Sequence, residues 1–394
     1  MIPCPVRPRL FVFATIAAAI VSAAPLFAQR KETAAFVVRL GTDTVALEQY
    51  TRVGNRIEGD LLTRLPATRL FHWVITVSRA GLPEKVDYFP RNPDGTVNPR
   101  GAQSITLTFA PDSITREIRW VDSAQVRRFA NDGTVIPAFG TAFATYELGT
   151  RWMRTAKRDS AGIRFMSVNA AQLPAPLALR MWRDSARFDF FGNPMMFRVD
   201  RLGRILSADG SRTTLKLMAV RVPSVDVAGN AVMFAARDKA GSALGAASTR
   251  DTVRASIGTA ALWVDYGRPA LRGRQVWVNG VLGDTLWRTG ANAATQFRTD
   301  TDLTVAGASV PAGMYTLWTH TKRDGTYELI INRQTGQWGT IYDRAQDLVR
   351  VPLTRNVLPA PIERFTIMLE PRGATGVLKF VWDTVELSVP VAPR

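Results

Sequence analysis

Short runs in which apolar and polar residues alternate recur through most of the chain, and they constrain the fold more than any other feature. Examples in the first half are Phe36 to Leu40, Phe71 to Val77, Ile105 to Phe109, Arg187 to Phe191 and Leu215 to Val220. Successive side chains of a strand point to opposite faces of a sheet, so a period of two indicates half-buried β-strands. Asp94-Gly95, Asp132-Gly133 and Asp209-Gly210 supply turn signals, because glycine accepts the positive φ of a tight turn. We therefore predict an antiparallel sheet domain over residues 30–222.

Two segments depart from the alternation. From about Ala142 to Lys157 the apolar residues recur at near-helical spacing, and a second short helix is predicted from Val225 to Lys239. Ala240 to Thr249 consists almost entirely of Ala, Gly and Ser, which is typical of a linker. We predict that residues 223–249 separate two domains.

The second half returns to short alternating runs. The predicted strands are Val253 to Ile257, Ala261 to Tyr266, Gln275 to Val278, Gln296 to Thr299, Thr316 to Thr319, Tyr327 to Ile331, Asp347 to Leu353, Phe365 to Glu370 and Val377 to Val381. Asn279-Gly280 and Asp324-Gly325 provide turns between them. Many short strands with almost no helix favour an antiparallel, jelly-roll-like β-sandwich over residues 250–394. The predicted fold class is thus all-β with a few short helices.

The first 28 residues have the pattern of a secretory signal peptide. Arg7 and Arg9 precede an apolar run of 15 residues, and a stretch of small residues ends at Ala28. A bilayer-spanning helix needs roughly 20 apolar residues, so a retained anchor is the less favoured alternative and no transmembrane segment is expected after cleavage. We expect export to the periplasm or the exterior. Cys4, the single cysteine, leaves with the signal, which excludes thiolate nucleophiles, thiolate zinc sites and iron–sulfur clusters from the mature chain.

The chain is strongly basic, with a formal net charge of +17, and 43 of its 50 basic residues are arginines. The basic residues are dispersed, with no more than two adjacent, and acidic residues lie between them. Charges more than about 8 to 10 Å apart are largely screened at physiological salt, so this pattern does not predict a nucleic-acid partner. An acidic glycan or an anionic lipid of the cell envelope remains the expected kind of partner.

Several motifs of the second half occur together. They are Asp265-Tyr266-Gly267-Arg268-Pro269, Arg272-Gly273-Arg274, the run from Trp287 to Thr295, the run from Pro311 to Tyr315, Trp338-Gly339 and Asp347-Leu348-Val349-Arg350-Val351. Over about residues 248–391 the sequence resembles the bacterial family called domain of unknown function 2911. The resemblance implies an exported bacterial protein and supplies no activity. Residues 30–222 show no resemblance that we can name.

These motifs also provide the candidate ligand-binding residues, which are Arg268, Arg272, Arg274, Arg288, Asn292 and Thr295. Guanidinium groups bind carboxylate, sulfate or phosphate through paired N–H donors, so these side chains could converge on an anion. Alternatively, the same side chains could brace the loops by donating to main-chain carbonyls. Asp347 and Arg350 are an odd number of positions apart, which predicts opposite faces of a strand and therefore no shared site.

The tryptophans of the second half form another candidate group. Trp263, Trp277, Trp287, Trp318, Trp338 and Trp382 could present a platform on which sugars stack, or they could fill the core of the sandwich.

Motifs of common enzymes are absent from the sequence. His72 and His320 lie in different predicted domains, which argues against a histidine metal site, and no cofactor is expected. Neither a G-x-S-x-G elbow nor a glycine-rich phosphate loop occurs. We therefore expect an exported, non-enzymatic protein that binds an anionic or polyhydroxy envelope ligand. A carboxylate-dependent glycoside hydrolase or lyase, and a lipid-carrier or structural role, are the alternatives.

Overall fold

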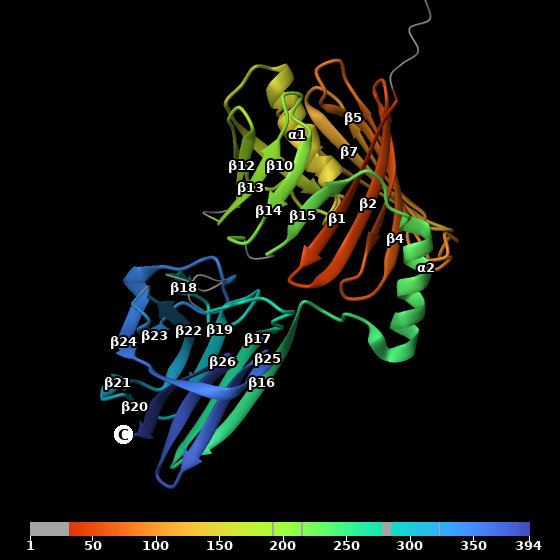
Figure 1. Cartoon of the computed structure of the whole chain (residues 1–394). Helices are drawn as coiled ribbons and strands as arrows, with labels where there is room; N and C mark the ends of the chain where they lie inside the picture. The colour runs from red at the N-terminus through yellow and green to blue at the C-terminus, as the bar shows by residue number, and fades with distance from the viewer. Residues whose placement is uncertain (1–30, 191–192, 214–215, 278–284, 323) are drawn as a thin grey trace, which may run out of the picture.

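The computed structural model describes residues 31–190, 193–213, 216–277, 285–322 and 324–394 (Figure 1). It confirms the predicted all-β class, because strands, nearly all antiparallel, make up most of the described chain. The segment predicted as a signal peptide lies outside the described residues. So do Phe191, Leu215, Val278 and the turn Asn279-Gly280.

The first half forms one sheet of 15 strands. They are β1 (Glu32–Leu40), β2 (Asp43–Val53), β3 (Arg56–Thr63), β4 (Arg69–Val77), β5 (Pro83–Arg91), β6 (Ser104–Phe109), β7 (Ser113–Arg119), β8 (Ala124–Ala130), β9 (Val135–Ala138), β10 (Ser160–Ser167), β11 (Leu177–Met181), β12 (Ser185–Phe190), β13 (Asn193–Val199), β14 (Ile205–Asp209) and β15 (Met218–Val222). β1 lies between β2 and β15, so that one arm runs from β1 to β8 and the other from β15 to β9. β9 and β10 pair in parallel, and the other neighbours are antiparallel.

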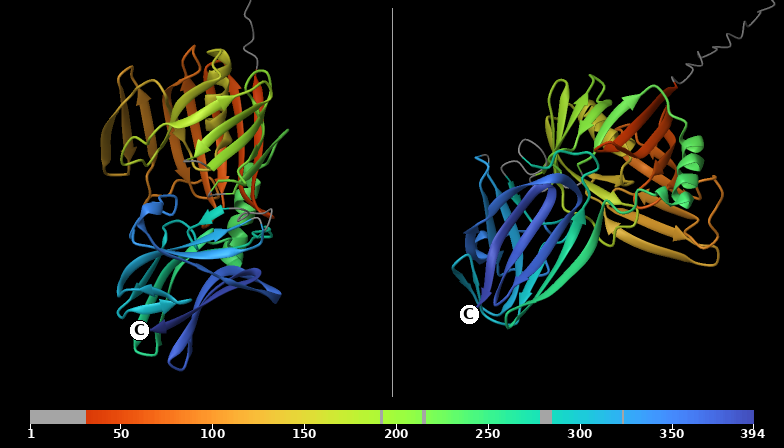
Figure 2. Two further views of the ribbon diagram at one scale, coloured as in Figure 1. Left: turned by 90° about the vertical axis from the view of Figure 1, so that its left-hand side faces the viewer. Right: turned by 60° about the horizontal axis from the view of Figure 1, so that its bottom comes forward.

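Helix α1 (Phe143–Thr155) lies between the two arms of this sheet, in good agreement with the predicted helix (Figures 1 and 2). The Phe143 ring lies 5.6 Å from that of Phe36 on β1 and 6.4 Å from that of Phe197 on β13. All three are almost fully buried, and each such side chain contributes about 1.5–3 kcal/mol to folding. The helix therefore supplies the core that a curved sheet cannot provide alone.

Two glutamate side chains, those of Glu48 and Glu147, are buried beside α1. Glu48 on β2 accepts the backbone N–H groups of Phe143 and Ala144 at 2.6 and 3.1 Å. These N–H groups belong to the first turn, whose N-cap residue provides no side-chain acceptor, so Glu48 caps the helix from the sheet.

Glu147, on α1 itself, is the centre of a second polar network. Its Oε1 accepts the Tyr50 hydroxyl and Arg151 Nε, and its Oε2 accepts the Ile205 N–H and Arg221 Nη1, each at 2.8 Å. Four donors thus satisfy a carboxylate that is 2% exposed, as a buried charge requires.

The second predicted helix is also present, as α2 (Val227–Arg237), which ends in a single π-helical turn (Asp238–Ser242). It lies on the outer face of the sheet, where its Ala231 and Phe234 pack against Leu47, Leu62 and Leu70 (Figure 1). The chain then continues without regular structure to residue 248.

The second half is a β-sandwich. One sheet contains β16 (Ser248–Ile257), β17 (Ala260–Pro269), β18 (Thr285–Trp287), β19 (Thr295–Thr299), β22 (Gly313–Thr321), β23 (Tyr327–Asn332) and β24 (Asp347–Pro352). The other contains β20 (Leu303–Val305), β21 (Ala308–Val310), β25 (Thr354–Arg372) and β26 (Thr375–Pro393). A 3-10 turn (Arg344–Gln346) precedes β24. The inner faces enclose one apolar core that includes Phe297, Phe365, Phe380 and Trp382.

One predicted strand of the sandwich is wrong, and two others are confirmed but are longer than predicted. Gln275 to Trp277 belong to no strand, although Val276 and Trp277 are buried. Trp277 instead fills the core from a loop and donates its Nε1–H to the Trp382 carbonyl at 2.8 Å, so its burial gave a strand-like pattern without strand pairing. The strands predicted at Phe365 to Glu370 and Val377 to Val381 are parts of a much longer hairpin, in which β25 and β26 have 19 residues each.

Candidate functional site

Arg268 on β17 is fully engaged within the protein. Its Nε donates to the Phe365 carbonyl at 3.1 Å, Nη1 pairs with Asp251 at 2.9 Å, and Nη2 donates to the Thr366 hydroxyl at 2.9 Å. These contacts tie β17 to both β16 and β25. All three nitrogens have acceptors, so the geometry gives Arg268 a bracing role.

Arg272 joins the two halves of the chain. Its Nη1 pairs with Asp43, at the β1–β2 turn, at 2.6 Å, and its Nη2 donates to the Leu244 carbonyl at 2.7 Å. The Arg272 carbonyl in turn accepts the Thr42 N–H at 2.9 Å. Gly41 has a φ of +61°, and a Cβ on it would lie 1.8 Å from the Arg272 oxygen. The turn can therefore approach this loop only because residue 41 is glycine.

The other predicted site residues are distributed over different surroundings. Arg274 donates Nε to the Leu271 carbonyl at 2.8 Å and Nη2 to the Ala270 carbonyl. Thr295 is buried and donates to the Thr289 carbonyl at 2.7 Å, while Asn292 is exposed in a turn with a φ of +64°. Arg288 makes no hydrogen bond or ion pair with any described residue. The structure thus does not bring the six residues together into one pocket.

Asp347 and Arg350 also differ from the prediction, which placed them on opposite faces. Arg350 donates Nε and Nη2 to Asp347 Oδ2 at 2.9 and 2.7 Å. Asp347 is the first residue of β24 and the pairing of β23 with β24 shifts register next to it, so the period of two does not hold there. The long arginine side chain reaches back to the carboxylate, and Tyr342 donates to the same group.

A groove on the outer face of the sandwich contains a different set of side chains. It has a volume of about 730 Å³, and its lining includes Arg254, Trp263, Arg298 and Met314. These four residues are direct cross-strand neighbours, in that order, on β16, β17, β19 and β22. One row of the sheet therefore places an indole between two guanidinium groups, with a thioether at its end.

The alternation of the strands explains why these side chains face outward. Leu262 and Val264 of β17 are buried in the core, so Trp263 between them lies on the opposite face. On β16 the exposed positions 254 and 256 alternate with more buried ones in the same way. The alternation of apolar residues at Ala261 to Tyr266 could have predicted from the sequence that Trp263 faces outward, unlike the tryptophans of the core. Trp277, Trp287, Trp318 and Trp382 are indeed buried, whereas Trp338 is 52% exposed.

The groove carries unpaired positive charge. Within the described part of the chain, neither Arg254 nor Arg298 has a hydrogen-bond or ion-pair partner. Asp300 is the single carboxylate among the described lining residues. It accepts the Ala261 N–H at 2.7 Å and the Thr301 hydroxyl at 3.1 Å, and these bonds, with Arg298 nearby, lower the pKa of Asp300. The groove therefore offers a ligand an apolar ring and two guanidinium groups that form no hydrogen bond or ion pair with a described residue.

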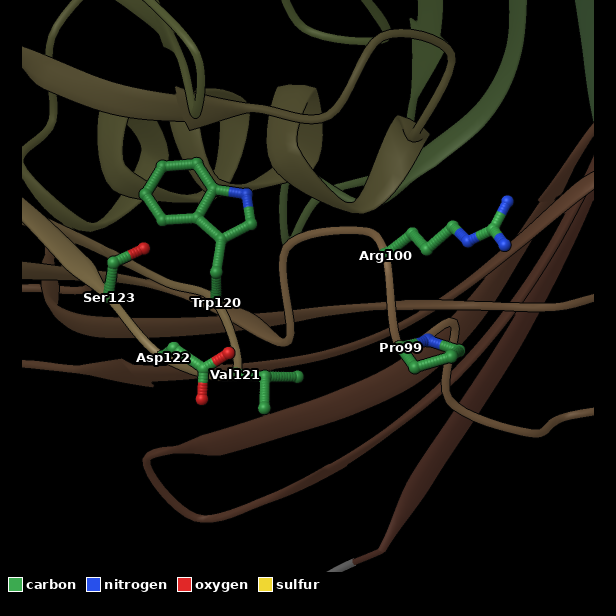
Figure 3. Close-up of a pocket in the computed structure, with 6 residues that line it drawn as sticks. All are labelled: Pro99, Arg100, Trp120, Val121, Asp122 and Ser123. Carbon is green, nitrogen blue, oxygen red and sulfur yellow. The ribbon is translucent and has the colours of Figure 1, made fainter.

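A second hollow, of about 420 Å³, lies on the first half (Figure 3). Trp120 to Ser123 line it from the turn between β7 and β8, and Pro99 and Arg100 line it from the loop between β5 and β6. In Figure 3 the guanidinium of Arg100 points away from the Trp120 indole, so the two do not converge on one ligand. We regard the first groove as the stronger candidate.

Neither a metal site nor a membrane-spanning helix is found among the described residues. No group of three or more His, Cys, Asp or Glu side chains is placed to hold a metal ion there. Nor does any helix of this part of the chain have the length and hydropathy needed to cross a bilayer.

Together these features define a β-protein of two parts, with an aromatic and cationic groove on the sandwich. Residues 248–391, which form that sandwich, match the model of a family described as "Protein of unknown function (DUF2911)". The match confirms the resemblance expected for this part, and the N-terminal part matches no family. No curated protein is matched by the chain.

Proposed function

We propose that this is an exported, non-enzymatic protein whose C-terminal sandwich binds an acidic polysaccharide of the cell envelope in the groove at Trp263. The observation that carries the proposal is the row in which Arg254 and Arg298, both without partners among the described residues, flank an outward-facing indole. The basic net charge, which is +17 for the full sequence and +15 without Arg7 and Arg9 of the predicted signal, favours the approach of such a polymer.

The chemistry of the row fits a chain of sugar rings that carry carboxylates or sulfates. An indole presents a flat apolar face, against which the C–H face of a sugar ring can pack. Adjacent strands are about 4.8 Å apart, so the backbones of Arg254 and Arg298 are separated by about 10 Å, with Trp263 midway. A ring can thus lie over the indole while acidic groups on its neighbours pair with the two guanidiniums.

Two alternatives receive less support from the same geometry. A carboxylate-pair glycosidase needs two carboxyl groups facing across a cleft, whereas Asp300 alone lines the described part of the groove. A lipid carrier would need an apolar hollow in the first half, and α1 fills the space between the arms of that sheet with Phe143, Leu148 and Met153.

The test compares two polymers that differ in charge alone. Polygalacturonate and its fully methyl-esterified form share one backbone, and only the former carries carboxylates. We expect the full chain to bind polygalacturonate and to bind the ester at least about tenfold more weakly, because a hydrogen bond to a charged group contributes about 1.5–3 kcal/mol. Arg254→Gln/Arg298→Gln should reduce polygalacturonate binding to the level of the ester. Trp263→Ala should weaken binding of both polymers.

Matched controls remove equivalent groups elsewhere on the sandwich. Arg344→Gln/Arg355→Gln also removes two charges from exposed positions, and Trp338→Ala removes an exposed indole. Both controls should keep wild-type affinity within about twofold. Equal losses in the control and groove variants, or no binding of polygalacturonate by the wild type, would refute the proposal.

A further inference from the structure

The two halves meet where the first sheet ends, and this contact brings together three cations. Arg39 on β1 is paired with Met218 on β15, so Lys216, just before β15, and Gly41, just after β1, lie at the same end of the sheet. Gly41 contacts the loop of the second half, since a Cβ on it would lie 3.1 Å from Arg274 Cγ. Lys216 and Arg274 therefore approach one another across the contact between the halves.

Arg288 directly follows β18, which lies at the end of the second half that faces the first (Figure 1), and its charge acts on Lys216. It follows Trp287, which is buried in the core, and its side chain crosses directly over Gly339. A Cβ on Gly339 would lie 1.7 Å from Arg288 Cδ and 2.7 Å from Nε, so a glycine is needed to leave room for the side chain. Arg288 Nε is buried there without an acceptor in the described chain.

Among the described residues, none of the three cations forms an ion pair with a carboxylate. Glu363, which accepts the Arg272 N–H at 3.0 Å, is near enough to raise the pKa of Arg274, but burial and the charge of Arg272 lower this pKa overall. Neither the Lys216 ammonium nor the Arg288 guanidinium has a hydrogen-bond or ion-pair partner among the described residues, and Arg274 leaves Nη1 unused. Burial, together with the charges of Arg274 and Arg288, lowers the pKa of Lys216 to about 8. Burial lowers the pKa of Arg288 to about 10. Arg272 is different, because Asp43 neutralises it.

Partly buried like charges are costly unless an anion joins them. From this arrangement we infer that Lys216, Arg274 and Arg288 form a second site, between the two halves, for a compact oxyanion of the phosphate or sulfate type. Such an anion accepts several N–H donors at once and adds negative charge beside Lys216 and Arg288, for which no carboxylate partner is found among the described residues. It would connect a lysine of the first half to arginines of the second, and it is independent of the groove at Trp263.

The experiment measures the thermal stability of the full chain in chloride and in phosphate at equal ionic strength. A ligand that binds the folded state stabilises it, so we expect phosphate to raise the melting temperature of the wild type. Titration calorimetry should give one site per chain. In Lys216→Gln/Arg288→Gln the affinity for phosphate should fall at least about tenfold, because two charge-assisted donors are lost. Sulfate and glycerol phosphate, tested in parallel, distinguish a free anion from a phosphate ester.

Three comparisons keep the result unambiguous. In chloride, Lys216→Gln/Arg288→Gln should be at least as stable as the wild type, because the repulsion between the cations is removed. A melting temperature in chloride below that of the wild type would therefore identify a misfolded variant. Lys239→Gln/Arg201→Gln removes the same charge from exposed positions and should keep the phosphate effect. Arg254→Gln/Arg298→Gln should also keep it, which separates this site from the proposed groove. If phosphate stabilises the wild type no more than chloride does, or stabilises the double variant equally, the inference is wrong.

Discussion

Glu48 provides a quantitative test of how the first half is held together. Its carboxyl group is fully buried, Oε2 caps α1, and Oε1 has no partner among the described residues. Burial raises the pKa of Glu48 from the ordinary 4.5 to about 8, against the two helix N–H groups, which lower it.

The sign of the resulting pH dependence follows from proton binding. The unfolded chain loses this proton near pH 4.5 and the folded chain keeps it until about pH 8, so the folded state binds more protons in between. The stability that Glu48 contributes to the folded state is therefore fully present below pH 4.5 and is lost as the pH rises from about 4.5 to about 8. The difference between the two pKa values corresponds to about 5 kcal/mol.

Glu48→Gln removes the titration but keeps a carbonyl oxygen for the two helix N–H groups. Native-state hydrogen exchange of the α1 and β2 amides gives the free energy of opening of this region. The free energy of the wild type minus that of Glu48→Gln should fall by up to about 5 kcal/mol between about pH 4.5 and about pH 8. Glu84→Gln, at an exposed position of β5, should show no such trend. A wild-type-to-variant difference that does not change with pH would refute the reasoning.

Two further substitutions test other contacts. Glu147→Gln removes the charge with which two arginines pair, so it should destabilise the first half by about 3–5 kcal/mol, measured by the same hydrogen exchange. Glu117 is half-exposed, and Glu117→Gln should cost less than about 1 kcal/mol. Equal costs for the two variants would contradict the role assigned to Glu147. Gly41→Ala should open the contact with Arg272 and increase proteolysis of residues 243–247, whereas Gly95→Ala, which has a similar positive φ and open space around it, should not; equal cleavage of the two variants would refute the close approach.

The periodic part of the fold was predictable from the sequence. Alternation marked the strands, near-helical spacing marked α1, and a second short helix was predicted at α2, each helix within a few residues of its observed bounds. The buried side of α2 is Val227, Ala231 and Phe234, whereas Val232 and Met233, which are also apolar, are exposed. The loop at Val276 and Trp277 was misjudged because a loop that enters the core has the same apolar pattern as a strand. A local sequence pattern predicts which residues are buried, but it does not predict strand pairing, because pairing depends on residues that are distant in the sequence.

The hydrogen-bond and ion-pair partners of the candidate arginines were not predictable, because these partners are distant in the sequence. The Arg268 acceptor at Phe365 is 97 positions away, and Asp43 is 229 positions from Arg272. Lys216 could not be linked to Arg274 and Arg288 for the same reason. Trp263 was more accessible to prediction, since the alternation of β17 alone places it outward.

The central claim, that the groove binds an acidic glycan, is tested most directly by a crystal structure of the full chain with a galacturonate oligosaccharide. The account predicts a sugar ring packed on the Trp263 indole, with carboxylates on neighbouring rings within hydrogen-bond distance of Arg254 and Arg298. An oligosaccharide bound elsewhere, with this row of side chains uncovered, would contradict it.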